Sequence, residues 1–384
     1  MNTWVELDET KLVRNLRALE HAAGPATEVL AVVKANAYGH GAERCSVALV
    51  GAGAQWLGVT CADEGVRVRE ALTAAGLTAD VLVMSGFLPG DVAAMREYAL
   101  TPVLWTADHV AWLTGGGWAV HVEVDTGMGR QGVRPGDELA QLLSQMDDGG
   151  IALDGIFTHF CSSEQAGSAL TQQQERGFDH AVAQIAGRGA ERGLRPAWVH
   201  AGNSSTVDNP AQASPWLASL AATVGARAMV RTGLALYGFC LPIEGAAPHQ
   251  VQARLEPVMT WKARVLSVRD LAPGETVGYN ATFTAPHARR IALLPAGYAD
   301  GLRRELSWRD DGSGGWVMIA GKRASILGRV SMNLTVVDVT GLGPVAPGDE
   351  AILLGPGITA EDHARLAGTI SYEILCGVKA GIRD

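Results

Sequence analysis

Short apolar segments alternate with amphipathic segments over the first 240 residues of the chain. A run of about four to eight apolar residues is typical of a buried strand, and apolar residues spaced three and four apart are typical of a helix. Strands that alternate with helices pair in parallel. Eight such apolar segments predict a closed (β/α)8 barrel, which places its chemistry at the carboxyl ends of its strands.

The predicted barrel strands are Val29–Lys34, Trp56–Thr60, Val81–Ser85, Pro102–Thr106, Ala119–Asp125, Ile151–His159, Ala197–His200 and Ala226–Val230. Helical patterns lie between most of them, as at Glu9–Ala22, Ala62–Ala74 and Thr171–Arg188. A doubly wound sheet is the weaker alternative, because its phosphate loop needs the pattern GxGxxG between a strand and a helix. The nearest match, Gly51-Ala52-Gly53, has Trp56 in place of the third glycine and precedes a strand.

The pattern changes after Cys240, where Leu241–Gln250 has the composition of a linker. Strand-like segments then follow at close spacing, separated by Gly, Pro and Asp, which is typical of a mostly-β domain. We therefore expect a barrel over residues 1–240, whose first few residues can pair with the second domain, and a mostly-β domain over residues 241–384. The expected strands of the second domain are Met259–Val268, Arg290–Leu294, Val317–Ala320, Ala324–Leu327, Leu334–Val339 and Ala351–Leu354.

Composition and charge exclude several classes of protein. The chain has 384 residues, 47% of them apolar and 18% charged, which is typical of globular domains. The net charge of -9 and the lack of a basic block argue against nucleic acid and anionic membranes as partners. The five cysteines are scattered and form no CxxC pair, so no metal site is expected. The first ten residues carry no signal-peptide pattern, and we expect a cytoplasmic protein.

The segment Val32–Gly41, VVKANAYGHG, holds the most informative residue. Lys34 follows an apolar strand and so lies at the predicted mouth of the barrel. Lysine is a candidate Schiff-base amine in such a place, because partial desolvation lowers its pKa. Taken alone, a lysine that extends its stem along the strand end and its amine into solvent is the more common explanation.

Other polar residues also fall at the carboxyl ends of predicted strands: Asp125, Arg130, His159, His200 and Arg231. The loops after strands seven and eight, which hold Ser204 and Gly233, frequently build a phosphate site in barrels. Alone, these two residues are more often simple turn residues. Together with Lys34 they fit pyridoxal phosphate.

These segments resemble the alanine racemases, the fold-type III pyridoxal-phosphate enzymes. The resemblance runs from Trp4 to the C-terminus, and its motifs occur in the family order. They read VVKANAYGHG, VDTGMGRQG, FTHF, HAGNSS, VRTGLALYG, VGYNATFT, GYADG, GRVSMN and SYEILCGV. The resemblance implies racemisation of alanine for peptidoglycan precursors.

The resemblance assigns roles to single residues. Lys34 would hold the cofactor and act as one base, and Tyr279 of a second subunit would be the base on the opposite face, since racemisation needs a group on each face of a planar carbanion. His159 would link Tyr279 to Arg231, and Arg231 would meet the pyridine nitrogen. Tyr38, Ser204, Gly233, Leu234 and Tyr372 would hold the phosphate with His200 alongside; Arg130 and the backbone of Met332 would bind the substrate carboxylate; Tyr298, Arg304 and Arg329 would line the entrance corridor.

Three departures from the family pattern stand out. Glu123 occupies the position of a lysine that the family usually carbamylates, and our hypothesis is that its carboxylate orients Arg130 through a charge-assisted pair. Asn333-Leu334 and Cys161–Glu164 also differ, which leaves the substrate open.

Several alternatives stay open. A racemase of serine or another small amino acid is one, and a non-catalytic pyridoxal-phosphate carrier is another. The decarboxylases of this fold are disfavoured, since they lack a residue like Arg231 and this tyrosine-bearing domain. Because Tyr279 and Met332 would act in trans, we expect an isologous homodimer.

Overall fold

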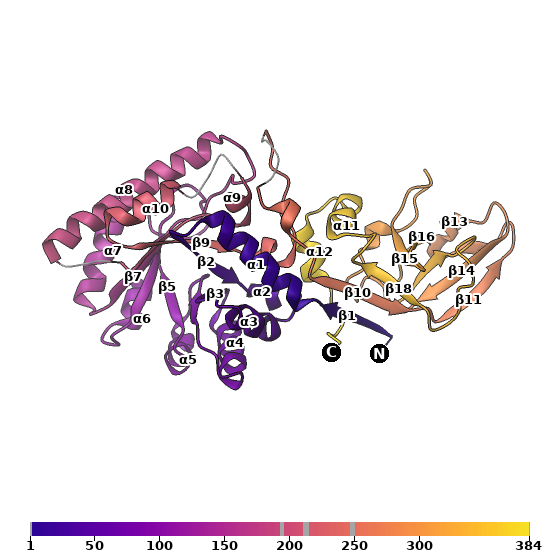
Figure 1. Cartoon of the computed structure of the whole chain (residues 1–384), viewed down its shortest axis with the longest axis horizontal. Coiled ribbons are helices and arrows are strands. Elements are labelled where there is room, and N and C mark those ends of the chain that lie inside the picture. Colours follow the sequence, from indigo (N-terminus) through magenta and orange to yellow (C-terminus); the bar gives the residue numbers. More distant parts are fainter. Residues whose placement is uncertain (1, 193–195, 210–214, 246–249, 384) are drawn as a thin grey trace. The chain divides into compact units, whose positions relative to one another are not determined.

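The computed structural model describes residues 2–192, 196–209, 215–245 and 250–383, and within them the chain forms two compact units (Figure 1). The larger unit comprises Glu9–Ala37 and Ala42–Glu256. The smaller unit comprises Met1–Asp8, Tyr38–Gly41 and Pro257–Asp384. The short segment Tyr38–Gly41 therefore belongs with the second unit although it lies in the loop after the first barrel strand.

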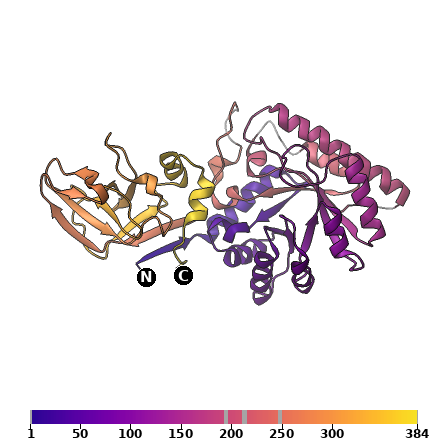
Figure 2. The same cartoon turned by 180° about the vertical axis from the view of Figure 1, so that it is seen from behind.

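The larger unit is a closed barrel of eight parallel strands, which confirms the predicted fold. Helices cover the outside of the barrel, as the view from behind shows (Figure 2). The strands are β2 (Thr27–Val32), β3 (Trp56–Val59), β4 (Asp80–Val83), β5 (Thr101–Leu104), β6 (Ala119–Glu123), β7 (Ala152–Phe157), β8 (Trp198–His200) and β9 (Arg227–Thr232). The helices are α1 (Glu9–Ala23), α3 (Ala42–Gly51), α4 (Ala62–Ala74), α5 (Val92–Glu97), α6 (Ala107–Leu113), α7 (Asp137–Asp148), α8 (Ala169–Arg192), α9 (Ser204–Asp208) and α10 (Pro215–Thr223). The label α2 marks Lys34–Tyr38, which forms a left-handed turn and no regular helix.

Helix α1 illustrates why the apolar spacing predicts these elements well. Leu12, Leu16 and Leu19 are fully buried and lie three and four residues apart, so they form one face of the helix. The same face carries Asn15, whose amide donates to the carbonyl oxygens of Leu236 (2.9 Å) and Glu256 (2.8 Å). A buried amide must be hydrogen-bonded, so Asn15 fixes two later segments of the chain to the first helix.

The segment after Cys240 is attached to the barrel. The Asp208 carboxylate accepts hydrogen bonds from the backbone N–H groups of Val251 (2.8 Å) and Gln252 (3.0 Å). The side-chain oxygen of Asn15 accepts from the N–H of Glu256 (2.9 Å). Because of these hydrogen bonds, the larger unit extends to Glu256 and the smaller unit resumes at Pro257. The sequence pattern predicts the boundary earlier, at residue 240.

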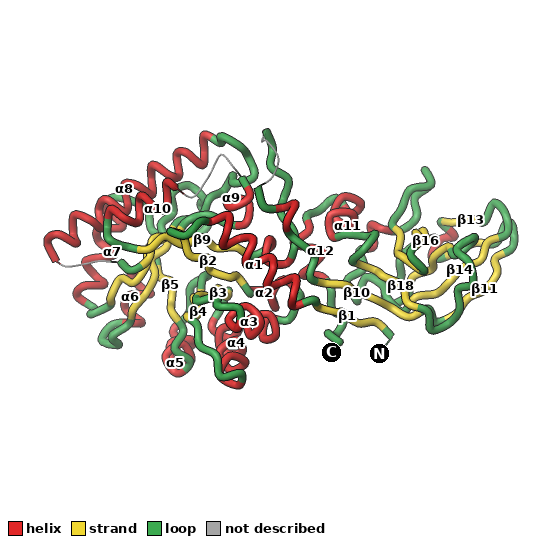
Figure 3. Tube along the Cα trace, in the orientation of Figure 1, coloured by secondary structure: helices red, strands yellow, loops and turns green. Residues whose placement is uncertain are grey.

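The second unit is built on an eight-stranded sheet with the order β1-β10-β18-β15-β16-β17-β14-β11 (Figure 3). Its first strand comes from the N-terminus and pairs antiparallel with β10. The strands of this sheet are β1 (Thr3–Leu7), β10 (Met259–Arg264), β11 (Ser267–Leu271), β14 (Arg289–Leu294), β15 (Trp316–Ile319), β16 (Lys322–Leu327), β17 (Thr335–Asp338) and β18 (Glu350–Leu354). The predicted strand Met259–Val268 is thus two strands, β10 and the start of β11.

Two helices and a hairpin complete the second unit, and the strand pattern does not predict them. Helix α11 (Ala360–Ala367) begins with a capping box in which Thr359 and Asp362 bond to each other's backbone N–H, and α12 (Ser371–Gly377) follows. The hairpin pairs β12 (Thr276–Val277) with β13 (Phe283–Thr284) and carries the turn that holds Tyr279.

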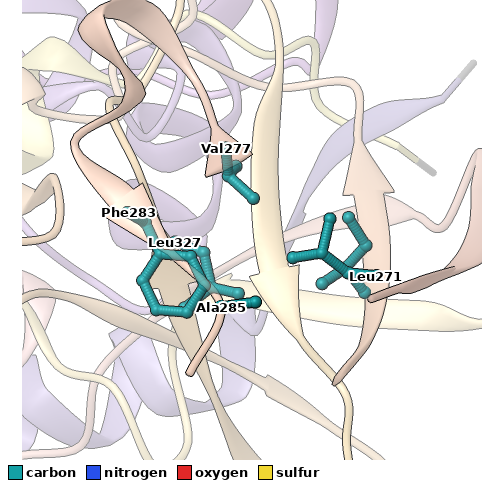
Figure 4. Close-up of a cluster of buried hydrophobic side chains, with 6 residues drawn as sticks. Leu271, Val277, Phe283, Ala285 and Leu327 are labelled. Atoms are coloured by element: carbon teal, nitrogen blue, oxygen red, sulfur yellow. The ribbon is translucent and has the colours of Figure 1, made fainter. Parts of the chain in front are cut away.

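A cluster of buried apolar side chains anchors this hairpin to the sheet (Figure 4). Val277 and Phe283 come from its two strands, and Phe283 packs edge-to-face on Trp308 with ring centroids 5.1 Å apart. The hairpin is therefore held from both sides of the turn. The full cluster is Leu271, Val277, Phe283, Ala285, Ile291 and Leu327.

Truncation of Phe283 should destabilise the second unit. Phe283→Ala removes a buried aromatic ring, which typically costs about 3–5 kcal/mol. Urea denaturation followed by tryptophan fluorescence measures the loss. Leu266→Ala, at an exposed apolar residue of the same unit, is the matched control and should cost about 0.5 kcal/mol or less. Equal transitions for the two variants would contradict the anchoring role.

Candidate active site

Lys34 begins a left-handed turn directly after the first barrel strand. Ala35, Asn36, Ala37 and Tyr38 have φ of 51°, 55°, 53° and 53°, where the sequence pattern predicts an ordinary loop. Each such residue costs about 1–2 kcal/mol in an L-chain. Strain of this kind persists only where neighbouring groups hold it and is typical of functional sites.

Hydrogen bonds to side chains and backbone hold the turn. Glu64 accepts from the N–H of Ala35 (2.8 Å), and the Asn36 side-chain oxygen accepts from the N–H of Ala42 (3.0 Å). The turn therefore fixes the backbone of Lys34 at the carboxyl end of β2, where the pattern predicts it.

Arg231 on β9 is the centre of a buried polar network. Its Nη1 donates to Nδ1 of His200 (3.2 Å), and its Nη2 donates to the Thr158 carbonyl (2.8 Å) and to Nδ1 of His159 (3.2 Å). The guanidinium also lies 4.7 Å from the centroid of the Phe157 ring. The structure thus brings together three of the predicted site residues, His159, His200 and Arg231.

The network fixes the protonation of its histidines. Arginine has only donors, so Nδ1 of His159 and of His200 must accept, and each ring carries its single proton on Nε2. Burial and the neighbouring Arg231 lower the pKa of His159 to about 3, and burial holds the pKa of His200 well below its usual range. Burial lowers the pKa of Arg231 to about 10, so it stays a cation at neutral pH.

Two groups at this end of the barrel have protons to donate and no acceptor within the described ranges. Nε–H and one Nη1–H of Arg231 remain unused, although the residue is only 5% exposed. The Ser204 oxygen accepts from the N–H groups of Gly233 (3.1 Å) and Ala235 (3.2 Å), which leaves its own proton available. Leu234 lies between these two and begins a short 3₁₀ turn. A ring nitrogen and a phosphate oxygen are acceptors that fit these donors, so the residues suit pyridoxal phosphate.

Glu123 is buried at the end of β6 and is hydrogen-bonded to Gln131, whereas the sequence predicts a pair with Arg130. Its carboxylate accepts a hydrogen bond from the side-chain amide of Gln131, which also donates to the Met84 carbonyl (3.0 Å). The exposed Arg130 forms no ion pair with Glu123 in the described part of the chain, so the direct pair is a wrong expectation. Burial raises the pKa of Glu123, while Gln131 and the charges of Arg231 and Arg130 act against this shift.

Sequence reasoning misses Gln131 because a glutamine in a loop gives no signal of its own. Only the folded chain places it against a buried carboxylate. Asp125 also has a local role, since its oxygen accepts from the N–H groups of Gly127 and Gly129 (both 3.0 Å) and shapes the loop that leads to Arg130.

The unusual loop Cys161–Glu164 binds to helix α9, which begins at Ser204. Ser205 donates to the Glu164 carboxylate (3.0 Å), and the Thr206 hydroxyl donates to that of Ser163 (3.1 Å). Two of these departures from the family pattern, Ser163 and Glu164, therefore contact the residues of α9 that follow Ser204.

The remaining predicted residues lie in the second unit. Tyr38 and Tyr372 pack together with ring centroids 5.8 Å apart, and burial raises the pKa of Tyr38. Tyr279 and Met332 are 67% and 55% exposed, so neither is covered within its own chain. Tyr298 is also exposed.

Arg304 and Arg329 share one cavity of about 450 Å³ in the second unit. Thr282, Ser307 and Trp308 also line it.

Among the described residues, no three metal-ligating side chains converge, and no helix is both long and apolar enough to cross a membrane.

Comparison with known proteins places the chain in a family. The family model described as alanine racemase, N-terminal domain, matches residues 7–240, and that described as alanine racemase, C-terminal domain, matches residues 258–384. An alanine racemase of Symbiobacterium thermophilum is 37% identical over 98% of this chain and 94% of its own length. This chain belongs to the alanine racemase family.

Solved structures agree with this assignment. An alanine racemase from Streptomyces coelicolor A3(2) is 31% identical, with a TM-score of 0.82 and coverage of 100% of this chain and 97% of its own. An alanine racemase from Bartonella henselae, described with covalently bound pyridoxal phosphate, is 27% identical, with a TM-score of 0.81 and coverage of 100% and 99%.

Acid should destabilise the barrel through His159. The unfolded side chain has a pKa of about 6.5 and the folded one of about 3, so between these values the unfolded state binds more protons and stability falls as the pH falls. One such group contributes up to about 1.4 kcal/mol per pH unit. His159→Asn keeps an oxygen that accepts from Arg231 but cannot be charged, so its stability should fall less steeply between pH 6.5 and 5 in urea denaturation. Identical slopes would contradict the buried neutral ring.

Proposed function

We propose that the protein interconverts L- and D-alanine with pyridoxal phosphate bound covalently to Lys34. The observation that carries this proposal is the buried Arg231, which donates to two neutral histidines and has donors left for a ring nitrogen. The cofactor of the Bartonella henselae relative and the names of the relatives support it.

The residues that would hold the cofactor are those with unused donors and their neighbours. The Ser204 hydroxyl and the N–H of Leu234, which follows Gly233, would bind the phosphate, together with Tyr38 and Tyr372. Arg130 would contact the phenolic oxygen, and His200 supports Arg231. When bound, pyridoxal phosphate withdraws electrons from an attached amino acid and so acidifies its Cα proton.

Arg231 favours racemisation over other reactions. A guanidinium gives up no proton at neutral pH, so it offers the ring nitrogen a hydrogen bond and leaves it unprotonated. This moderates electron withdrawal and restrains side reactions such as transamination.

Two groups must exchange the Cα proton on opposite faces, and we assign these to Lys34 and Tyr279. A phenol with a pKa of about 10 is a weak base at neutral pH. His159 would assist it: its Nδ1 is occupied by Arg231, and its Nε2–H is the group that can donate to the phenolic oxygen.

A homodimer follows from this assignment. Tyr279 and Met332 are exposed on their own chain, which suits residues that complete the site of a partner subunit across an isologous interface. Met332 would offer its backbone N–H to the substrate carboxylate.

The scattered cysteines favour a reducing cytoplasm as the compartment of this protein.

Replacement of Tyr279 tests the two-base assignment. Tyr279→Phe should lower the rate of alanine racemisation by roughly 10² to 10⁴, the usual contribution of a general base, while cofactor absorbance is unchanged. Inversion of L-alanine and of D-alanine, followed separately in D2O, measures this rate, because Lys34 alone could still exchange the Cα proton of one enantiomer without inverting it. Tyr98→Phe, in the barrel and away from the site, is the control. An active Tyr279→Phe enzyme, or a wild type that binds cofactor but catalyses no exchange, would refute the proposal.

A panel of single amino acids decides the substrate. Exchange with inversion for alanine supports the leading proposal. Inversion of serine alone would favour the alternative racemase, and binding without exchange would favour the carrier.

Activity should be indifferent to bicarbonate, because Glu123 carries a carboxylate that needs no carbamylation. The wild type should change by less than about twofold between bicarbonate-free and bicarbonate-rich buffer. Glu123→Lys, which restores the residue usual in the family, should become dependent on bicarbonate. A large bicarbonate-dependent rise in wild-type activity would contradict the proposal that the Glu123 carboxylate replaces a carbamylated lysine.

A further inference from the structure

The Arg231 network continues through the barrel core beyond His200. Nε2 of His200 lies 2.9 Å from Nδ1 of His121, and Nε2 of His121 lies 3.3 Å from the Asp154 carboxylate. His121 and His200 are fully buried, and the Asp154 side chain is 32% exposed. A chain of hydrogen bonds thus runs from Arg231 to the amino-terminal half of β7.

The direction of every hydrogen bond in this chain is determined. Arg231 donates to Nδ1 of His200, so His200 is protonated on Nε2 and donates to Nδ1 of His121. His121 must then carry its proton on Nε2, where Asp154 accepts it. All protons point from Arg231 toward Asp154, and each of the two histidines accepts from one partner and donates to the next.

Two features of β7 make room for this arrangement. The register between β6 and β7 shifts between Val120 and His121, so that Leu153 faces Val120, Gly155 faces His121, and Asp154 has no opposite residue. Such a bulge re-aims a side chain. A Cβ atom on Gly155 would lie 2.6 Å from the His121 ring, so only glycine leaves space for this ring.

The His121 ring is held on its other sides as well. Trp56 packs on it with ring centroids 5.2 Å apart. The charged groups that act on it are Asp154, Asp80 and Arg231. Burial lowers the pKa of His121, which keeps it neutral, as the direction of the bonds requires.

We propose that Asp154 and His121 are positioning residues for the racemase reaction, which act through His200 to orient Arg231 toward the ring nitrogen of the cofactor. The inference rests on the proposed function. A carboxylate at the far end polarises both rings and strengthens the bond that Arg231 donates to His200. The unused guanidinium donors are thereby held in one direction.

Labelling the cofactor tests the relay. The holoenzyme is prepared with pyridoxal phosphate carrying 15N at the ring nitrogen, whose NMR shift reports its hydrogen bond. Asp154→Ala should move this shift and lower kcat by roughly tenfold, as outer-shell substitutions often do, with KM within about twofold. Asp154→Asn keeps an oxygen that can accept from His121, so its ring-nitrogen shift and its kcat should both lie close to those of the wild type.

Two further variants separate positioning from structure. Asp80→Ala removes a carboxylate at the start of β4 that acts on His121 only through its charge, so the shift and kcat should stay near wild type. Gly155→Ala alters no relay residue but displaces the His121 ring, and it should move the shift as Asp154→Ala does. Long-range 1H–15N spectra of the histidines should give the Nε2–H form for His121 and His200.

The outcomes distinguish the relay from the function. An unchanged ring-nitrogen shift in both Asp154→Ala and Gly155→Ala would overturn the relay while leaving the racemase assignment intact. An equal effect of Asp80→Ala would also overturn it, because charge alone would then suffice. A wild type that binds no labelled cofactor would instead refute the proposed function.

Discussion

One buried cation organises the mouth of the barrel. Arg231 is withdrawn from water, and a buried charge is tolerated only where polar partners surround it. Because a guanidinium can only donate, each partner must be an acceptor, and two of these acceptors are imidazoles. The charge therefore dictates the tautomers of His159 and His200, and through His200 that of His121. Which ring nitrogen of each histidine carries the proton therefore decides what these residues can donate to or accept from.

Glu123 is a buried negative charge, and it too requires polar or oppositely charged neighbours. A buried carboxylate beside two arginines balances part of their charge, although it bonds to the neutral Gln131 and pairs with neither arginine directly. Its charge therefore acts on the two arginines through the electric field and not through a direct ion pair. The proposal that a glutamate serves here in place of a longer modified side chain therefore depends on its charge and its burial.

The sequence predicts the barrel well because each strand is a short apolar run and each helix has a clear apolar face, as Leu12, Leu16 and Leu19 show for α1. It also places Lys34, His159, His200 and Arg231 at strand ends. It cannot predict the left-handed turn, since alanine has no preference for that conformation and tertiary contacts impose it. Nor can it find Gln131 or Asp154, whose roles depend on a loop contact and on a one-residue bulge. Helices α11 and α12 are missed because they are only 8 and 7 residues long, too short for a clear apolar face.

The left-handed turn after Lys34 has a stereochemical consequence. Its four residues adopt the dihedral angles that are natural for D-amino acids and costly for L-amino acids. D-alanine introduced by chemical synthesis at residues 35 and 37 would relieve the steric clash there, whereas at ordinary helical positions it would create one. The segment that carries the proposed cofactor lysine in this racemase thus has, in its own backbone, the handedness of the mirror-image amino acid.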